Sequence, residues 1–99
     1  MIVTSYKAKK NDDENVAFPN LQCWNPQTEV ATVAAQYRGR RVSCRVKIID
    51  LKKKFRFFPD QPMQVVTKYR MEIEAAARKL IAKNEFQDDG SILIKYQDL

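Results

Sequence analysis

The sequence predicts a small α+β domain of order β-β-β-α-α-β, in which a four-stranded, mainly antiparallel sheet carries two helices on one face. Three observations favour this class. The chain has 99 residues, enough for one core. Residues 29–48 alternate polar and apolar side chains like a hairpin, and residues 62–80 repeat apolar side chains at helical spacing. We expect residues 15–99 to form this single domain and residues 1–14 to be a flexible polar tail.

The first elements are a short strand and a loop. Val16-Ala17-Phe18 is expected to be the strand, and Pro19-Asn20 ends it. Leu21 to Pro26 is then expected to be a loop. We interpret Trp24 in this loop as a packing anchor rather than a ligand platform, because an indole buries a large apolar area.

The clearest local structure is a hairpin on either side of Gly39, a residue that supplies the positive φ of a tight turn. With Arg38-Gly39 as its two-residue loop, Ala35 faces Val42 and Val33 faces Cys44 on one apolar face. A slip of one residue would turn arginines toward the core, so this register is strongly favoured. The other, solvent-facing side then contains Val30, Thr32, Ala34, Gln36, Arg41, Ser43, Arg45 and Lys47.

A short helix follows the hairpin. We expect it to begin around Asp50, which is a suitable N-cap, and to end before Pro59. Leu51, Phe55 and Phe58 have the spacing of one helical face.

A longer helix and a final strand complete the domain. The helix is expected to begin at Asp60-Gln61-Pro62 and to fade at Asn84-Glu85, before a turn at Asp88-Asp89-Gly90. The last strand should cover Ser91 to Tyr96. The apolar stripe of the long helix consists of Val66, Tyr69, Ile73, Ala76 or Ala77, and Leu80.

Composition excludes several kinds of chemistry. The chain contains no histidine, which removes every catalytic or metal site that needs an imidazole. It has no glycine-rich phosphate loop, so we expect no enzyme activity, no metal and no cofactor. No apolar stretch is long enough to be a signal peptide or a membrane span, and we expect a cytoplasmic protein. Cys23 and Cys44 are expected to be free and buried, with a disulfide as the less favoured alternative.

The positive charge is concentrated in one segment. The whole chain has a net charge of +6, but residues 1–37 and 57–99 each contribute −1, whereas residues 38–56 contribute +8. Alternate strand residues are spaced by about 7 Å, close to a phosphate step, so the segment is a candidate nucleic-acid surface. The alternative is a solvated sheet face whose cations prevent edge-to-edge pairing. The bases are Arg38, Arg40, Arg41, Arg45, Lys47, Lys52, Lys53, Lys54 and Arg56.

Arg70 and Glu74 form a second polar group, four residues apart on the long helix. We favour a structural ion pair at the helix surface or between helix and sheet, over a clamp for a carboxylate or phosphate. Glu74 also precedes Arg78 by four residues, which predicts an exposed pair.

The order and spacing of several motifs resemble a family of short bacterial proteins catalogued only as a domain of unknown function. The resemblance covers about residues 16–98. It implies an α+β fold of a sheet with two helices and supplies no catalytic residues. The matching residues are Phe18-Pro19-Asn20, Trp24, Ala31-Thr32-Val33-Ala34-Ala35, Gly39-x-x-Val42-x-Cys44, Leu51-x-x-x-Phe55, Tyr69-Arg70-x-x-Ile73-Glu74-x-x-Ala77, Phe86, Gly90 and Ile92-Leu93-Ile94.

The sequence therefore predicts a non-catalytic accessory or regulatory protein that acts through protein–protein association. A homodimer is expected, through a sheet face or edge containing Val30 and Ala34. The alternative function is nucleic-acid binding through the basic residues 38–56. The solvent-facing side of the hairpin has no aromatic residue, which argues against recognition of single strands by base stacking.

Overall fold

The computed structural model describes residues 16–56 and 62–99. The predicted tail, Phe58, Pro59 and the Asp60-Gln61 helix start lie outside the described residues. The predicted α+β class is confirmed. The elements are β1 (Val16–Ala17), β2 (Gln22–Asn25), β3 (Val30–Tyr37), β4 (Arg40–Lys47), α2 (Ile48–Phe55), α3 (Pro62–Lys68), α4 (Arg70–Ala82), β5 (Ile92–Ile94) and the 3₁₀ helix η1 (Tyr96–Asp98).

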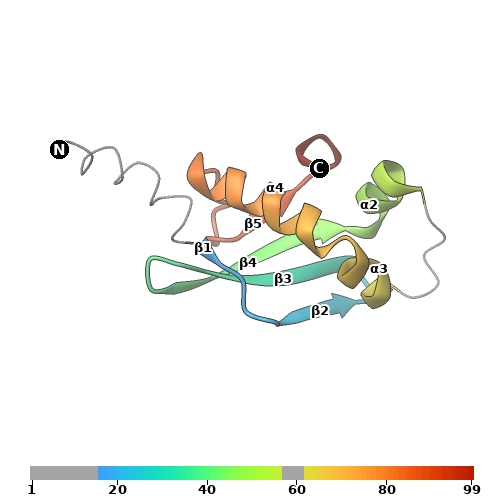
Figure 1. The fold of residues 1–99 in the computed structure, drawn as a ribbon, viewed down its shortest axis with the longest axis horizontal. Coiled ribbons are helices and arrows are strands. Elements are labelled where there is room, and N and C mark those ends of the chain that lie inside the picture. The colour runs from blue at the N-terminus through green and yellow to red at the C-terminus, as the bar shows by residue number, and fades with distance from the viewer. Residues whose placement is uncertain (1–15, 57–61) are drawn as a thin grey trace.

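The sheet is mixed and lies beneath a single layer of helices (Figure 1). β2 pairs with the first half of β3, and β1 pairs with the last two residues of β3. The other edge of β3 pairs with β4, and all three pairs are antiparallel. β5 pairs with β4 in the parallel direction. Helices α2, α3 and α4 lie on one side of the sheet, and no helix of the described residues covers the opposite side.

The register predicted for the hairpin is confirmed. Ala35 is the partner of Val42, Val33 of Cys44 and Ala31 of Val46. Arg38 has φ 52° and Gly39 has φ 79°, the two positive φ values that a type I′ turn requires. The β3–β4 alternation therefore places its apolar half toward the helices.

The core lies between this apolar half of the sheet and the helix layer. Val33, Cys44 and Val46 are completely buried, as are Leu51 on α2 and Ile73 on α4. The expected apolar stripe is largely confirmed, since Val66, Ala76, Ala77 and Leu80 are also buried. Small alanines on α4 allow the helix to pack close to the sheet.

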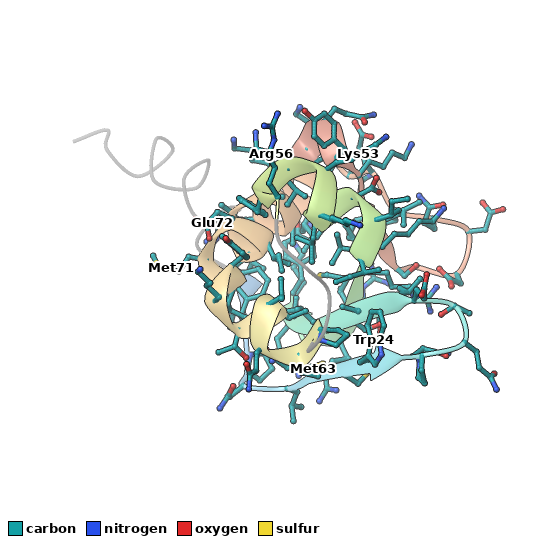
Figure 2. All side chains as sticks on the ribbon, turned by 90° about the vertical axis from the view of Figure 1, so that its right-hand side faces the viewer. Trp24, Lys53, Arg56, Met63, Met71 and Glu72 are labelled. Atoms are coloured by element: carbon teal, nitrogen blue, oxygen red, sulfur yellow. The ribbon has the colours of Figure 1, made fainter. Side chains whose placement is uncertain are left out.

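The expected loop at Leu21 to Pro26 is wrong, because Gln22–Asn25 form strand β2. Its backbone pairs with β3, with Trp24 opposite Ala31. The open edge of β3 provides hydrogen-bonding partners that the local sequence does not reveal. Trp24 is half-buried and packs against the core on the helix side, as expected for an anchor (Figure 2).

The short helix α2 differs from prediction at its start. It begins at Ile48, and its N-cap is Lys47, in extended conformation. Asp50 lies inside the first turn, so the prediction that it caps the helix is wrong. At the other end, Arg56 has φ 53° and its N–H donates to the carbonyl of Lys52 at 2.8 Å.

The single long helix that the sequence predicts is divided into α3 and α4. Tyr69 separates them, with φ −104° and ψ 23°. Its ring stacks on Phe55 of α2 at a centroid distance of 4.0 Å, a tertiary contact at the point of interruption. After α4 the expected turn at residues 88–90 is present, but β5 ends at Ile94 and Tyr96 begins η1.

Candidate functional site

The side of the sheet opposite the helices, which we call the outer face, is the candidate site. Strand alternation places on it one row of side chains from each of β2, β3, β4 and β5. No helix of the described residues covers this row (Figure 1). The outer face consists of Cys23, Asn25, Val30, Thr32, Ala34, Gln36, Arg41, Ser43, Arg45, Lys47 and Leu93.

An open hollow of about 310 Å³ lies in the outer face. Ala34 is only 8% exposed, although it does not belong to the core cluster on the helix side. Leu21, just before β2, is 50% exposed and is one of the lining residues. The hollow is lined by Leu21, Gln22, Cys23, Thr32, Ala34, Arg41 and Ser43.

The bases on the outer side of β4 differ in their partners. Arg45 Nη1 donates to Asp89 Oδ2 at 3.2 Å, across to the turn before β5. A hydrogen bond from the Ser91 hydroxyl, and then the nearby Arg45, lower the pKa of Asp89 below its ordinary value. Within residues 16–56 and 62–99, no carboxylate lies at ion-pair distance from Arg41 or Lys47. Among the described residues, two of the three cations on this face therefore have no carboxylate partner.

The other predicted bases lie elsewhere. Arg38 and Arg40 are at the hairpin tip, where their guanidinium carbons lie 5.1 Å from the ring centre of Tyr37 and 5.4 Å from that of Phe86. Arg40 is thus on the helix side of the sheet. Lys52, Lys53 and Lys54 belong to α2, which follows the far end of β4 (Figure 1), and Arg56 is the C-cap of that helix. Lys53 and Arg56 lie in the helix layer (Figure 2). The nine bases therefore form three groups: Arg38 and Arg40; Arg41, Arg45 and Lys47; and Lys52, Lys53, Lys54 and Arg56.

Arg70 connects the helix layer to the sheet edge. Its Nε donates to Glu74 Oε2 at 2.8 Å, and its Nη1 donates to Gln22 Oε1 at 2.6 Å. Its Nη2 donates to the carbonyl of Pro19 at 2.8 Å. The Arg70 side chain is 14% exposed, so these bonds lie largely out of water. Each of the three guanidinium nitrogens therefore donates one hydrogen bond, which holds α4 against β2 and leaves two of the five N–H groups for other partners.

The predicted Glu74–Arg78 pair is replaced by other contacts. Glu74 accepts from Arg70, whereas Arg78 Nη2 donates to the carbonyl of Val16 at 3.4 Å. The guanidinium of Arg78 also lies 5.1 Å from the ring centre of Phe18. Both arginines of α4 thus contact the start of the sheet.

The two cysteines occupy opposite faces. Both are free, as expected, and Cys44 is buried, but Cys23 is exposed and the prediction that it is buried is wrong. Burial raises the pKa of the Cys44 thiol from 9.0 to about 12, which makes it inert near neutral pH. The error at Cys23 follows from the missed strand, because β2 turns this side chain to the outer face.

The described residues contain neither a metal-binding cluster nor a helix that could span a membrane. Residues 16–56 and 62–99 contain no cluster of three or more His, Cys, Asp or Glu side chains with the geometry of a metal site. In the same part of the chain, no helix has the length and apolar character needed to cross a membrane.

Residues 16–94 match the family described as "Protein of unknown function (DUF1488)". The chain belongs to this family. The resemblance seen in the sequence is thereby confirmed. No match to the chain is found among curated proteins.

A solved structure shows the same fold in another member. It is the crystal structure of a protein of unknown function from the DUF1488 family of Shewanella loihica PV-4. The TM-score is 0.72 at 23% sequence identity, over 82% of this chain and 92% of that chain. At this identity the likeness concerns the fold.

Sequence reasoning identified the basic strand of the outer face but missed its hollow. The hollow needs Leu21 and Cys23 beside β3, and these residues were assigned to a loop. Residues 21–25 do not alternate regularly between polar and apolar side chains, so the sequence carries no periodic signal of this strand.

Proposed function

We propose that this protein is a non-catalytic accessory or regulatory protein that acts by binding another protein through the outer face. The uncovered sheet carries this proposal. A two-layer domain buries one side of its sheet under helices, and its other side is free to meet a partner. The half-exposed Leu21 and the small Ala34 make part of that side apolar. An apolar area on an uncovered surface favours a contact with a partner over a purely solvent-facing role. Two free cysteines suit a reducing compartment, so we place this activity in the cytoplasm.

Site-specific photo-crosslinking in the native cells tests the proposal. One version of the protein carries the photoreactive residue in place of Ser43 on the outer face. The matched control carries it in place of Ala75, which is exposed on α4. We expect a discrete protein adduct from the Ser43 version only, and the identified protein should bind again when both partners are purified. Adducts from the Ala75 version alone, or from neither version, would contradict the proposal.

Self-association is included in this proposal, and a homodimer remains a prediction. Of the two surfaces predicted for it, the edge is wrong because β3 is a central strand, whereas Val30 and Ala34 do lie on the uncovered face of the sheet. A symmetric contact of two outer faces would bring Arg41 and Lys47 of one copy near the same cations of the other, and this repulsion disfavours that arrangement. Light scattering at high micromolar concentration measures the mass, and a monomeric mass would remove the homodimer.

Nucleic-acid binding is the second candidate, favoured by the row of Arg41, Arg45 and Lys47 along one strand. Three phosphate contacts predict a slope of about −3 in log affinity against log salt concentration. An electrophoretic shift with mixed DNA and RNA at about 50 and 200 mM salt measures this slope. Replacing the three bases with Gln should flatten it, whereas no binding at the lower salt concentration would remove the candidate.

A further inference from the structure

The hollow in the outer face combines an apolar floor with a cation beside it. Ala34 is nearly covered and Leu21 is half exposed, while Arg41 is another residue of the lining. Thr32 and Ser43 contribute hydroxyl groups to the same lining. A partner that fills this hollow needs an apolar group and, next to it, a negative charge.

We propose that the hollow binds an acidic segment of a partner protein, with one aliphatic side chain of the segment seated over Ala34 and an adjacent carboxylate paired with Arg41. The inference rests on the proposed function, since it names the chemistry of the partner on the same face. A volume of about 310 Å³ is at the lower end of ligand pockets, which suits one anchoring side chain with its neighbouring backbone.

The positive charges around the hollow favour a negatively charged partner segment. Arg45 is already paired with Asp89, but Arg41 and Lys47 have no carboxylate at ion-pair distance among the described residues. A basic segment would bring like charges together, and so would a second copy docked face to face. An acidic segment is complementary to both free cations.

The composition of the outer face favours a protein over a nucleic acid. The outer face residues include no aromatic side chain on which a base could stack. The apolar floor of the hollow, formed by Ala34 and Leu21, offers no partner to a phosphate group, whereas an aliphatic side chain loses contact with water on entering it. Nucleic acid is therefore the competing result of the experiment rather than part of the proposal.

The experiment uses the full chain, labelled with ¹⁵N, and a synthetic peptide blocked at both ends. The peptide has one leucine with two glutamates on each side. We expect amide shifts around Thr32, Ala34 and Ser43 on titration. Replacing the peptide's leucine with serine should weaken binding about tenfold or more, because the buried aliphatic anchor is lost. Replacing its glutamates with lysines should abolish binding.

Two pairs of variants locate the contact. Arg41→Gln should weaken peptide binding about threefold, while Arg45→Gln, the same charge change on the same strand, should have a smaller effect because Asp89 already engages Arg45. Cys23→Phe should fill the hollow and reduce binding at least tenfold. Ala75→Phe, on the exposed side of α4 and away from the outer face, is its control and should leave binding unchanged.

The outcomes separate this inference from the proposed function. Equal losses in Arg41→Gln and Arg45→Gln, or unchanged binding in Cys23→Phe, would overturn the inference by indicating diffuse attraction. A partner cross-linked at Ser43 that binds independently of these variants would also overturn it, while the proposed function would stand. Displacement of the peptide by single-stranded DNA with shifts on the same amides would assign the face to nucleic acid. If neither the peptide nor a cross-linked partner binds, both proposals fall.

Discussion

The two faces of the β3–β4 hairpin are formed by alternate residues of the same two strands, yet they have opposite properties. On the inner face Val33, Cys44 and Val46 are completely buried against the helices. On the outer face Arg45 and Lys47 are exposed, and Ala34 is nearly covered without joining the core. The residues of the inner face are explained by their packing in the core. The hollow and the positive charge of the outer face are not required for that packing.

Charged groups show the same contrast. Arg70, on the helix side, makes three hydrogen bonds to three different residues and is 14% exposed. Arg45, on the outer face, bonds to Asp89, and both side chains are about half exposed. An exposed ion pair contributes little to stability, whereas removing one partner from a shielded network leaves polar groups unsatisfied.

The largest contrast should be between the two thiols. Cys23 should react with a thiol reagent in the native protein, while Cys44 should react about a thousandfold more slowly, because exposing it requires much of the fold to open. Stopped-flow thiol titration, with Cys23→Ser and Cys44→Ala assigning the two phases, measures this. Equal rates for the two thiols would show that the inner face is not closed.

The Cys44 thiol also predicts a dependence on pH. Burial raises its pKa from 9.0 to about 12, so the unfolded chain releases this proton first. The resulting contribution to the free energy of unfolding is complete below pH 9 and is lost as the pH rises from 9 to 12. Urea unfolding across this range should show a steeper fall for the native sequence than for Cys44→Ala.

A glutamine placed at position 42 or at position 41 of β4 tests the inner and the outer face with the same side chain. Val42→Gln should lower the free energy of unfolding by about 3 kcal/mol or more, because the amide is buried without partners. Arg41→Gln should change it by less than about 0.5 kcal/mol. Urea titration of both variants gives the difference, and similar losses would show that the outer face is also structural.

Substitutions of Arg70 and Arg45 should differ less in their effect on the free energy of unfolding. Arg70→Met should cost about 2 kcal/mol, since Gln22, Glu74 and the Pro19 carbonyl each lose a donor. Arg45→Met removes an exposed pair and should cost less than about 1 kcal/mol. Thermal unfolding compares the two variants. An equal cost would contradict the structural role of Arg70.

The smallest effect concerns Asp89, which lies in the turn before β5 and pairs with Arg45 of the outer face. Its pKa is lowered mainly by the hydrogen bonds from Ser91 and less by Arg45. Its contribution to stability is therefore present above the ordinary value of 3.8 and declines as the pH falls through the lowered pKa. Carboxyl-carbon NMR titration should show a larger rise of this pKa in Ser91→Ala than in Arg45→Gln.

Much of the fold was predictable where the chain repeats a pattern. The alternation around Gly39 predicted the hairpin, its turn and its register, because a slip of one residue would bury arginines. The apolar spacing from Val66 to Leu80 predicted the buried helical face but not its interruption at Tyr69, where the ring meets Phe55. Strand β2 was missed because its four residues are ordered by pairing with β3 rather than by their own preference.

By itself the sequence determined the two faces of the hairpin, the location of the positive charge and the absence of imidazole chemistry, since these depend on residue type and on spacing along one strand. The tertiary structure decided which bases share a surface, which carboxylate neutralises Arg45, and where Arg70 sends its donors. It also decided that Leu21 and Cys23 lie beside β3 and line the hollow over Ala34. These contacts join residues that are far apart in the chain. Local periodicity does not determine which distant residue provides the hydrogen-bonding partner of a strand edge or of a side chain.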